Sequence, residues 1–422
     1  MEAFIGKFGL DYPRISVIVT AHDRRKYLLG AMKSILSQDF PRDLYEVIVV
    51  KSFHDAAIDS QLENWGVTSL SSESPGIGAK VCEALKVAEG DVISFLEDDD
   101  LFLPGKLKAV HRAFDMGIDY YHGGLLVIDE DGKELRHEVG PSFLVGEGEK
   151  TKYARFMEFN HVWHGASAVA IRKSIIDQSA LREVEVSPDL FYFLEALLRG
   201  RSLLFDGRAL TAFRLGGSSL LGGARSAGDF SVAFERSTTA FLKDLLLLAR
   251  LAAGTPYAAF IKDLIASRRL RFSVVRGEAP NADILRAMVL SARRFYLGIP
   301  PRAYSPRLPR GAFVATFAFY LLLPLAPRRL KQIAIYYLYR SLHRGGLQPT
   351  LQDHRVHRLK GINPPWPLSP TTVRALSSVD EHCYHNPCGD RILTSLAHII
   401  REEYQPPFLD FVPNASSQHS NS

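Results

Sequence analysis

Cysteine, methionine and tryptophan are scarce in this sequence of 422 residues, which contains 3, 5 and 3 of them respectively. Three cysteines are too few for the disulfide framework that stabilises many secreted domains, and their scarcity is typical of a protein that folds in a reducing compartment. The segment before Pro13 also lacks the long apolar run of a secretory signal. We therefore expect the folded part of the chain to be cytoplasmic.

The sequence has no apolar run that we expect to span a membrane. Residues 312–326 form an apolar run of about 15 residues, or roughly 22 Å as a helix, whereas the hydrocarbon core of a bilayer is roughly 30 Å thick. Basic residues flank this run on both sides, without the charge asymmetry of a spanning helix. Leu330, Ile333 and Tyr337 then have the spacing of an amphipathic helix. Residues 301–345 are therefore interpreted as a helical hairpin, either a monotopic anchor at the membrane surface or a buried hairpin.

Charge and hydropathy place the chain among ordinary globular proteins. Hydrophobic residues make up 46% of it and charged residues 23%, which is enough apolar material for a sizeable core. The formal net charge of +5 suits an anionic partner such as a phosphorylated lipid, a membrane surface or a nucleic acid. The basic clusters at 268–271 and 307–310 carry no regularly interleaved aromatic residues. This pattern argues against nucleic-acid binding.

Short apolar runs alternate with helix-period segments between residues 14 and 100. The alternation is typical of β-α-β units and predicts an α/β fold with a largely parallel sheet. In this part the predicted strands are Ile15–Thr20, Glu46–Val50 and Val92–Leu96, and the predicted helices cover residues 28–36 and 81–90. Further along we expect a hairpin with an Asp131-Gly132 turn, strands at Ala168–Ile171, Ser202–Phe205 and Leu210–Arg214, and a helix at Pro188–Arg199.

The pattern changes near residue 225. No strand signal is obvious beyond Gly223, and helix-forming residues such as the run Leu245–Leu248 dominate. The chain is also longer than most single domains. We therefore predict an α/β domain at 1–225, a helical extension at 226–300, the hairpin at 301–345 and an irregular, partly disordered tail at 346–422.

Four consecutive acids, Glu97, Asp98, Asp99 and Asp100, follow the predicted strand Val92–Leu96. Open α/β sheets bind ligands at the carboxyl ends of their strands. Crowded carboxylates repel each other unless a cation joins them, and hard divalent ions such as Mg²⁺ or Mn²⁺ prefer carboxylate oxygens. The run therefore predicts a metal site, with a solvated acidic turn at the start of the next helix as the alternative.

The acidic run resembles a motif of glycosyltransferase family two, in which Leu-Asp-x-Asp-Asp is followed by a proline. Leu96–Asp100 and Pro104 match it, with Glu97 in place of the first aspartate. The opening ISVIVTAHDR at Ile15–Arg24 is also similar to the first strand and turn of that family. The resemblance implies the GT-A fold, a Rossmann-like and mainly parallel sheet flanked by helices, with a metal held by Glu97 and Asp99.

The resemblance also implies which residues contact a nucleotide-diphospho-sugar donor. They lie in the turn after the first strand, at the end of the second strand, in the glycine-containing turn Pro75–Lys80 and in the acidic run. These donor-binding candidates are Thr20, Ala21, His22, Arg24, Lys51, Gly76, Lys80, Asp98 and Asp100. Lys51 is a departure, because the family has an aspartate there that reads the base or the ribose, and a lysine accepts no hydrogen bonds. Either Asp55 or Asp59 replaces that acceptor, or Lys51 faces a phosphate.

An inverting transfer needs a general base that takes the proton of the acceptor hydroxyl. The family has this base in an acidic pair at the start of a late helix, and Ser187-Pro188-Asp189-Leu190 followed by Gly200 is similar, with a proline in place of Glu. Asp189 is therefore the candidate base, or else an acid that only interacts with the helix dipole. His164 and Arg214 are assigned to the acceptor side, and an ordinary polar turn is the alternative for His164.

These inferences predict an inverting, divalent-metal-dependent glycosyltransferase that moves a sugar to a glycan or lipid-linked acceptor at the cytoplasmic face of a membrane. The rival is a non-catalytic, membrane-associated scaffold with a degenerate GT-A domain, which Lys51 and Pro188 motivate. The rival predicts no metal-dependent nucleotide binding. Cys383 and Cys388, with two nearby histidines, offer zinc ligands but match no closed template, so a plain loop is the alternative.

Overall fold

A computed structural model describes residues 14–22, 24–139, 142–150, 164–215, 227–262, 264–265, 268–269, 327 and 329–330. All of them belong to the first of the chain's two compact units, Met1–Leu368. The expected tail at 346–422, with Cys383 and Cys388, lies outside the described residues, and so does nearly all of the expected hairpin at 301–345. No helix among the described residues is long and apolar enough to cross a membrane.

A ten-stranded sheet forms the centre of the fold, in the order β3-β2-β1-β4-β9-β6-β10-β5, with β7 beside β6 and β8 beside β10. The strands are β1 (Ile15–Ala21), β2 (Tyr45–Lys51), β3 (Thr68–Ser71), β4 (Val92–Glu97), β5 (Leu101–Phe102), β6 (Tyr120–Ile128), β7 (Glu134–Glu138), β8 (Phe143–Val145), β9 (Val169–Arg172) and β10 (Leu203–Arg214). Strands β3, β2, β1 and β4 are parallel, as predicted. The other half is mixed, because β9 runs antiparallel to both β4 and β6.

The registers bring the carboxyl ends of the first strands together. Thr20 of β1 pairs with Glu97 of β4, and Ala21 pairs with Lys51 of β2. Parallel strands that end at the same level present their following turns at one edge of the sheet. The candidate residues after β1, β2 and β4 therefore share that edge.

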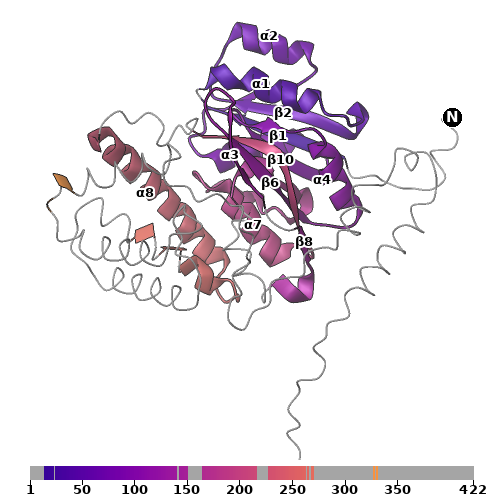
Figure 1. Cartoon of the computed structure of the whole chain (residues 1–422). Coiled ribbons are helices and arrows are strands. Elements are labelled where there is room, and N and C mark those ends of the chain that lie inside the picture. Colours follow the sequence, from indigo (N-terminus) through magenta and orange to yellow (C-terminus); the bar gives the residue numbers. More distant parts are fainter. Residues whose placement is uncertain are drawn as a thin grey trace, which may run out of the picture. The chain divides into compact units, whose positions relative to one another are not determined.

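Helices cover both faces of the sheet (Figure 1). One face packs on α1 (Arg25–Leu36), α2 (Ala56–Asn64) and α4 (Lys106–Asp115), and the other on α3 (Ile77–Val87), α7 (Pro188–Arg199) and α8 (Ala227–Leu251). A short helix, α6 (Gln178–Leu181), precedes α7. Successive side chains of a strand point to opposite faces, so Val17 and Val19 enter one core and Ile18 the other.

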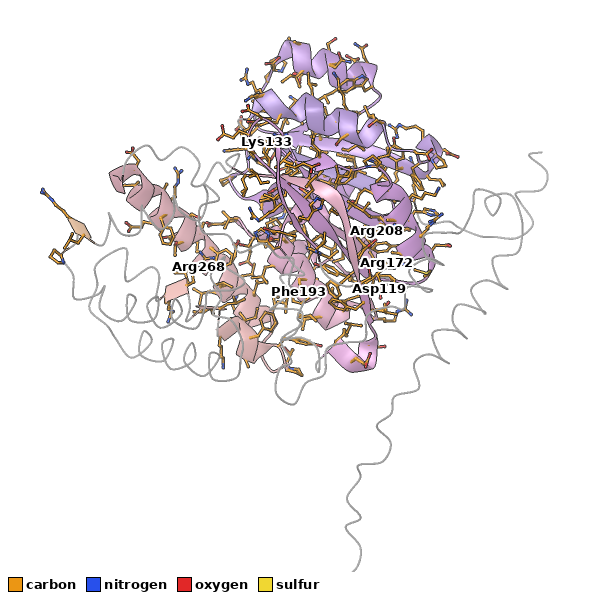
Figure 2. The ribbon with its side chains drawn as sticks, viewed as in Figure 1. Asp119, Lys133, Arg172, Phe193, Arg208 and Arg268 are labelled. Carbon is orange, nitrogen blue, oxygen red and sulfur yellow. The ribbon has the colours of Figure 1, made fainter. Side chains whose placement is uncertain are left out.

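The described part of the extension is helical, as the composition predicts. In α8, Leu245 and Leu248 are fully or almost fully buried and belong to the same hydrophobic cluster as α7. Phe193 of α7, labelled in Figure 2, lies with its ring centroid 6.0 Å from that of Tyr120 and 6.5 Å from that of Phe260. The helical extension thus completes the core on this face of the sheet. The boundary near residue 225 stays a prediction.

Several predicted elements need correction. The sequence analysis missed α2 and β3, which are inserted between β2 and α3. The two strands predicted at 202–205 and 210–214 are one strand, β10, whose irregular pairing at Asp206–Thr211 does not interrupt its alignment with β6. Strand β9 begins at Val169, because residues 166–168 form a short 3-10 helix. The predicted hairpin is confirmed: β6 and β7 are antiparallel, and Gly132 has a φ of 87° in the turn.

Candidate active site

The acidic run lies at the carboxyl end of β4 and is largely buried. Glu97 is the last residue of β4, and Asp98, Asp99 and Asp100 are 0%, 4% and 1% exposed. The guanidinium of Arg24, from the turn after β1, donates to Asp98 Oδ1 at 2.5 Å and also to Asp99 Oδ2. One arginine therefore faces two of the four carboxylates.

Burial dominates the electrostatics of the run. It raises the pKa of Asp98 to about 6, although the charge of Arg24 acts in the opposite direction. Burial and the neighbouring Asp99 raise the pKa of Asp100 to about 8. Burial, Asp100 and Asp99 raise the pKa of Glu97 well above its usual value. These carboxylates are therefore costly to ionise together unless a further positive charge is present.

A divalent cation fits the chemistry of this donor set. Carboxylate oxygens are the preferred ligands of Mg²⁺ and Mn²⁺, and the run has more buried acids than Arg24 can neutralise. Within the described part of the chain, no three carboxylate, imidazole or thiol groups already gather around one point. The predicted ligands Glu97 and Asp99 therefore stay a prediction supported by their chemistry.

Asp100 is fixed by a side chain of the 3-10 helix at 166–168 and by the backbone of β10. Its Oδ2 accepts a hydrogen bond from the Ser167 hydroxyl at 2.6 Å, and its Oδ1 accepts one from the backbone N–H of Arg214 at 2.8 Å. Ser167 Oγ also accepts from the backbone N–H of Glu97 at 3.0 Å. Both carboxylate oxygens of Asp100 are thus engaged within the protein. Sequence reasoning overlooked Ser167, although it lies three residues after His164.

Arg214 lies beside the acidic run. Its Nε donates to the carbonyl of Asp99 at 2.8 Å, and its Nη1 donates to the carbonyls of Asp129 and Glu130, each at 2.9 Å. The guanidinium also lies 4.6 Å from the centroid of the Tyr27 ring. Arg214 therefore joins the acidic turn to the β6-β7 hairpin, and its assignment to the acceptor side is not tested by these contacts.

The turn after β1 contacts the acidic run, the turn after β2 and helix α3. The backbone N–H of His22 donates to Asp98 Oδ2 at 3.2 Å. Its Nδ1 is 2.9 Å from Ser52 Oγ and 3.2 Å from Lys80 Nζ. Thr20 and Ala21 are the preceding residues of β1. Of the predicted donor-binding residues, His22, Arg24, Lys80 and Asp98 therefore form one cluster.

Lys51 is paired with an acid of the following helix. Its buried ammonium lies 2.8 Å from Asp59 Oδ1 and donates to the carbonyl of Phe53 at 2.9 Å. The hydrogen bond from Lys51 lowers the pKa of Asp59. Asp55 instead caps α2, because its Oδ1 accepts from two backbone N–H groups of the first turn, each at 3.2 Å. Of the two acids considered, Asp59 is the one held beside Lys51.

The glycines at the start of α3 allow close packing of two backbones. A Cβ added at Gly78 would lie 1.8 Å from the carbonyl oxygen of Leu181, and one added at Gly76 would lie 2.9 Å from that of Val184. The N–H of Gly78 donates to the Val184 carbonyl at 3.0 Å, and the N–H of Ile77 donates to the next carbonyl at 3.2 Å. Two N–H groups at this helix start thus bind protein. A phosphate contact at Gly76 stays a prediction.

Asp189 lies in the first turn of α7 and is half-buried. Its Oδ2 accepts from the backbone N–H of Gly165 at 3.0 Å, and its Oδ1 accepts from the N–H of Leu190 at 2.8 Å. Burial raises the pKa of Asp189, against His164 and these two N–H groups. The carboxylate is close enough to Glu97 to raise the pKa of that residue. Asp189 and the acidic run therefore belong to one site.

A buried histidine supports the residues beside Asp189. His122 of β6 makes a 3.0 Å hydrogen bond from Nε2 to the carbonyl of His164. That carbonyl belongs to the same peptide group as the Gly165 N–H that binds Asp189. Burial lowers the pKa of His122 to about 3, so its ring is neutral at physiological pH. The imidazole of His164 packs edge-on against Phe213, with ring centroids 5.6 Å apart.

Comparison with known proteins finds a family whose sequence profile matches part of this chain. Residues 16–182 match the sequence profile described as glycosyl transferase family 2. This range contains the acidic run, the turn after β1 and His164, and it ends before Asp189.

Individual relatives match over parts of their length. Poly(ribitol-phosphate) beta-N-acetylglucosaminyltransferase TarS of Staphylococcus aureus is 34% identical over 128 residues, which is 28% of this chain and 21% of that protein. An uncharacterized glycosyltransferase of Rickettsia bellii is 26% identical over 207 residues, covering 47% of this chain and 29% of the relative. The chain thus spans about a fifth to a third of the length of these relatives.

Solved structures are similar at lower sequence identity. A crystal structure of S. aureus TarS in complex with UDP-GlcNAc has a TM-score of 0.46 and 16% identity, and covers 77% of this chain and 92% of that one. The mannosyltransferase PcManGT from Pyrobaculum calidifontis, in complex with GDP-Man and Mn²⁺, has a TM-score of 0.44 and 15% identity, and covers 78% of this chain and 87% of that one.

Proposed function

Residues 16–182 are a glycosyl transferase family 2 domain, and from this premise we propose that the chain is an inverting, divalent-metal-dependent glycosyltransferase. It moves a sugar from a nucleotide-diphospho-sugar to the hydroxyl of a glycan or lipid-linked acceptor. The observation that carries the proposal is the half-buried Asp189 carboxylate, which is held by two backbone N–H groups beside the acidic run.

Asp189 acts as the general base. Burial raises the pKa of this carboxyl, which strengthens the carboxylate as a proton acceptor. It takes the proton of the acceptor hydroxyl, whose oxygen attacks the anomeric carbon of the donor sugar. The bond from that carbon to the diphosphate oxygen breaks on the opposite face, and the electron pair leaves with the nucleoside diphosphate. The sugar is transferred with inversion.

The donor side is formed by the turn after β1 and the acidic run. His22, Arg24 and Lys80 offer positive charge and N–H donors toward a diphosphate. Glu97 and Asp99 would hold the Mg²⁺ or Mn²⁺ ion, and Asp100 keeps this turn in place through Ser167 and the Arg214 backbone. When bound, the ion supplies charge that stabilises the leaving diphosphate.

One relative guides the choice of acceptor to test. The name of the S. aureus relative specifies transfer of N-acetylglucosamine to poly(ribitol phosphate). A polyanionic acceptor of this kind agrees with the net charge of +5 of our chain. We therefore place a phosphate-containing glycan or lipid-linked acceptor first among the acceptors to test, at a membrane surface on the cytoplasmic side.

The first experiment measures release of nucleoside diphosphate by the purified chain. A panel of nucleotide sugars is supplied with Mn²⁺ or with EDTA, together with a membrane-lipid extract and a poly(ribitol phosphate) acceptor. Asp189→Asn is compared with Asp177→Asn, a matched change at the N-cap of α6, where Asn caps as well as Asp. Loss of a general base reduces turnover by about 10²–10⁴-fold, whereas the control keeps its activity.

Each outcome has a distinct meaning. Metal-dependent release with one donor, abolished in Asp189→Asn only, supports the enzyme and names the donor. Full turnover in Asp189→Asn would remove the general base from the mechanism. A folded protein that neither releases nor binds any nucleoside diphosphate would support the scaffold with a degenerate GT-A domain.

A further inference from the structure

One buried acid of α8 binds three consecutive backbone N–H groups just before Asp189. Asp244 Oδ1 accepts from Glu185 at 2.7 Å, and Oδ2 accepts from Val186 at 2.9 Å and from Ser187 at 2.8 Å. Asp244 is only 1% exposed. Successive N–H groups that converge on one carboxylate form a concave anion site, and here the protein supplies the anion itself. The last of the three donors is the N-cap residue of α7, two positions before Asp189.

The carbonyl groups just before Ser187 are bound by α3, the helix that carries Lys80. The carbonyl of Val184 accepts from Gly78, and the carbonyl of Glu185 accepts from Ile77, both at the start of α3. Residues 184–187, which we name the base-supporting segment, therefore lie between α3 and α8. The carbonyls of the first two of these residues accept from α3, and the N–H groups of the last three donate to Asp244.

The other links between α8 and this region are weak by comparison. Lys243 pairs with Glu185 at 2.7 Å, with side chains 62% and 37% exposed. Arg250 pairs with Glu183 at 2.7 Å, with side chains 66% and 59% exposed. Exposed ion pairs of this kind contribute little to stability, whereas hydrogen bonds from buried N–H groups to a carboxylate are stronger. Among the described residues, Asp244 therefore makes the strongest polar contact between the base-supporting segment and α8.

We propose that Asp244 is a positioning residue for the transfer reaction: by binding the three N–H groups of Glu185, Val186 and Ser187, it holds the start of α7 so that Asp189 faces the acceptor hydroxyl. The inference rests on the proposed function, because it takes Asp189 as the general base. It gives the helical extension a part in catalysis that the family match, which ends at residue 182, does not include.

The test is a double-mutant cycle between Asp244→Asn and Asp189→Asn, read as kcat and KM with a radiolabelled donor. An asparagine has one acceptor oxygen, so at least one of the three N–H groups loses its partner and faces an NH₂ group. We expect Asp244→Asn to lower kcat at least about tenfold while the KM for the nucleotide sugar changes less than about threefold. In the Asp189→Asn background the same substitution should cause no further loss, because coupled residues are not additive.

Two further variants separate positioning from folding. Lys243→Met removes the neighbouring exposed ion pair and should leave kcat and KM unchanged. Asp244→Glu keeps the carboxylate one methylene further out and should retain more turnover than Asp244→Asn. Hydrogen exchange gives a readout without catalysis: amides 185–187 should exchange at least about tenfold faster in Asp244→Asn, while the core amides of α7 keep their protection.

The outcomes distinguish this inference from the proposed function. If Asp189→Asn keeps full turnover, the proposed base is wrong. If Asp189→Asn loses turnover but Asp244→Asn does not, or if the two losses multiply, the base stands and Asp244 does not act through it. If both Asp244 variants unfold while Lys243→Met folds, Asp244 serves overall stability and the positioning role is overturned.

Discussion

The two helix glycines at 78 and 30 provide a matched test of the packing between α3 and the base-supporting segment. Alanine is favoured over glycine inside a helix by about 1 kcal/mol, so helix propensity alone predicts that both Gly30→Ala and Gly78→Ala stabilise the protein. The structure instead predicts that Gly30→Ala stabilises the protein and that Gly78→Ala destabilises it. A Cβ at Gly30 meets nothing within 4 Å, whereas one at Gly78 would lie 1.8 Å from the Leu181 carbonyl oxygen.

The magnitude follows from what must move. The carbonyl of Leu181 belongs to the backbone of α6 and cannot rotate away from the added Cβ. The clash is therefore relieved only if α3 moves away from residues 181–185. The hydrogen bonds from Gly78 to Val184 and from Ile77 to Glu185 are then lost, at about 1 kcal/mol each. Strain in the remaining contacts brings the total destabilisation to about 3 kcal/mol or more. Gly30→Ala should instead gain about 0.5–1 kcal/mol.

Thermal and urea unfolding of the two variants decide the matter. For a domain of this size, about 1 kcal/mol corresponds to about 2–4 °C in Tm, so Gly78→Ala should melt about 6–12 °C below the unchanged protein and Gly30→Ala slightly above it. Turnover should also fall in Gly78→Ala alone, because the displaced segment leads to Asp189. Equal stability of the two variants would refute the close approach of α3 to Leu181.

Two further predictions concern buried charge. His122 has a pKa of about 3 in the folded protein, against an ordinary 6.5. As the pH is lowered, the unfolded chain therefore takes up a proton at this residue before the folded protein does. The free energy of unfolding then falls by up to about 1.4 kcal/mol for each pH unit between these two pKa values. Urea unfolding should therefore show that His122→Gln loses about 2 kcal/mol less stability than the unchanged protein when the pH is lowered from about 6.5 to about 4.5. Equal losses in the two proteins would contradict the buried neutral ring. Lys51→Met removes the hydrogen bond that lowers the pKa of Asp59. An NMR titration of the Asp59 carboxyl should therefore find its pKa closer to the ordinary value in this variant. An unchanged pKa would mean that Lys51 does not pair with Asp59 in solution.

The sequence predicted the elements whose signals are local. The helix at Pro188–Arg199 was predicted with its observed bounds, because a proline at the first position and a glycine after the last mark its two ends. The acidic run was placed correctly at the end of β4, since a buried β-branched strand leads directly into it. Strand β3 was missed because it is a polar edge strand with mostly exposed residues and no apolar alternation.

Contacts between distant segments were not accessible to pattern reasoning. Ser167 binds Asp100 across 67 residues, and nothing in its immediate sequence distinguishes it from other serines of a turn. Asp244 stands in a leucine-rich helix, where an isolated acid normally marks the solvent-facing side. Its burial follows from three N–H groups that arrive from residues 185–187, so only the folded chain reveals why a charge is tolerated there.

The glycine turn at the start of α3 has a packing role that the sequence analysis did not foresee. The resemblance to the family indicated a contact of the turn Pro75–Lys80 with the nucleotide. The group that the structure brings there is the carbonyl side of residues 181–185. Because α3 also carries Lys80 beside His22, and the same segment continues to Asp189, the proposed donor side and the proposed base share one support. A substitution anywhere in the base-supporting segment should therefore disturb both halves of the site together, whereas changes at His22 or Lys80 should affect the donor half alone.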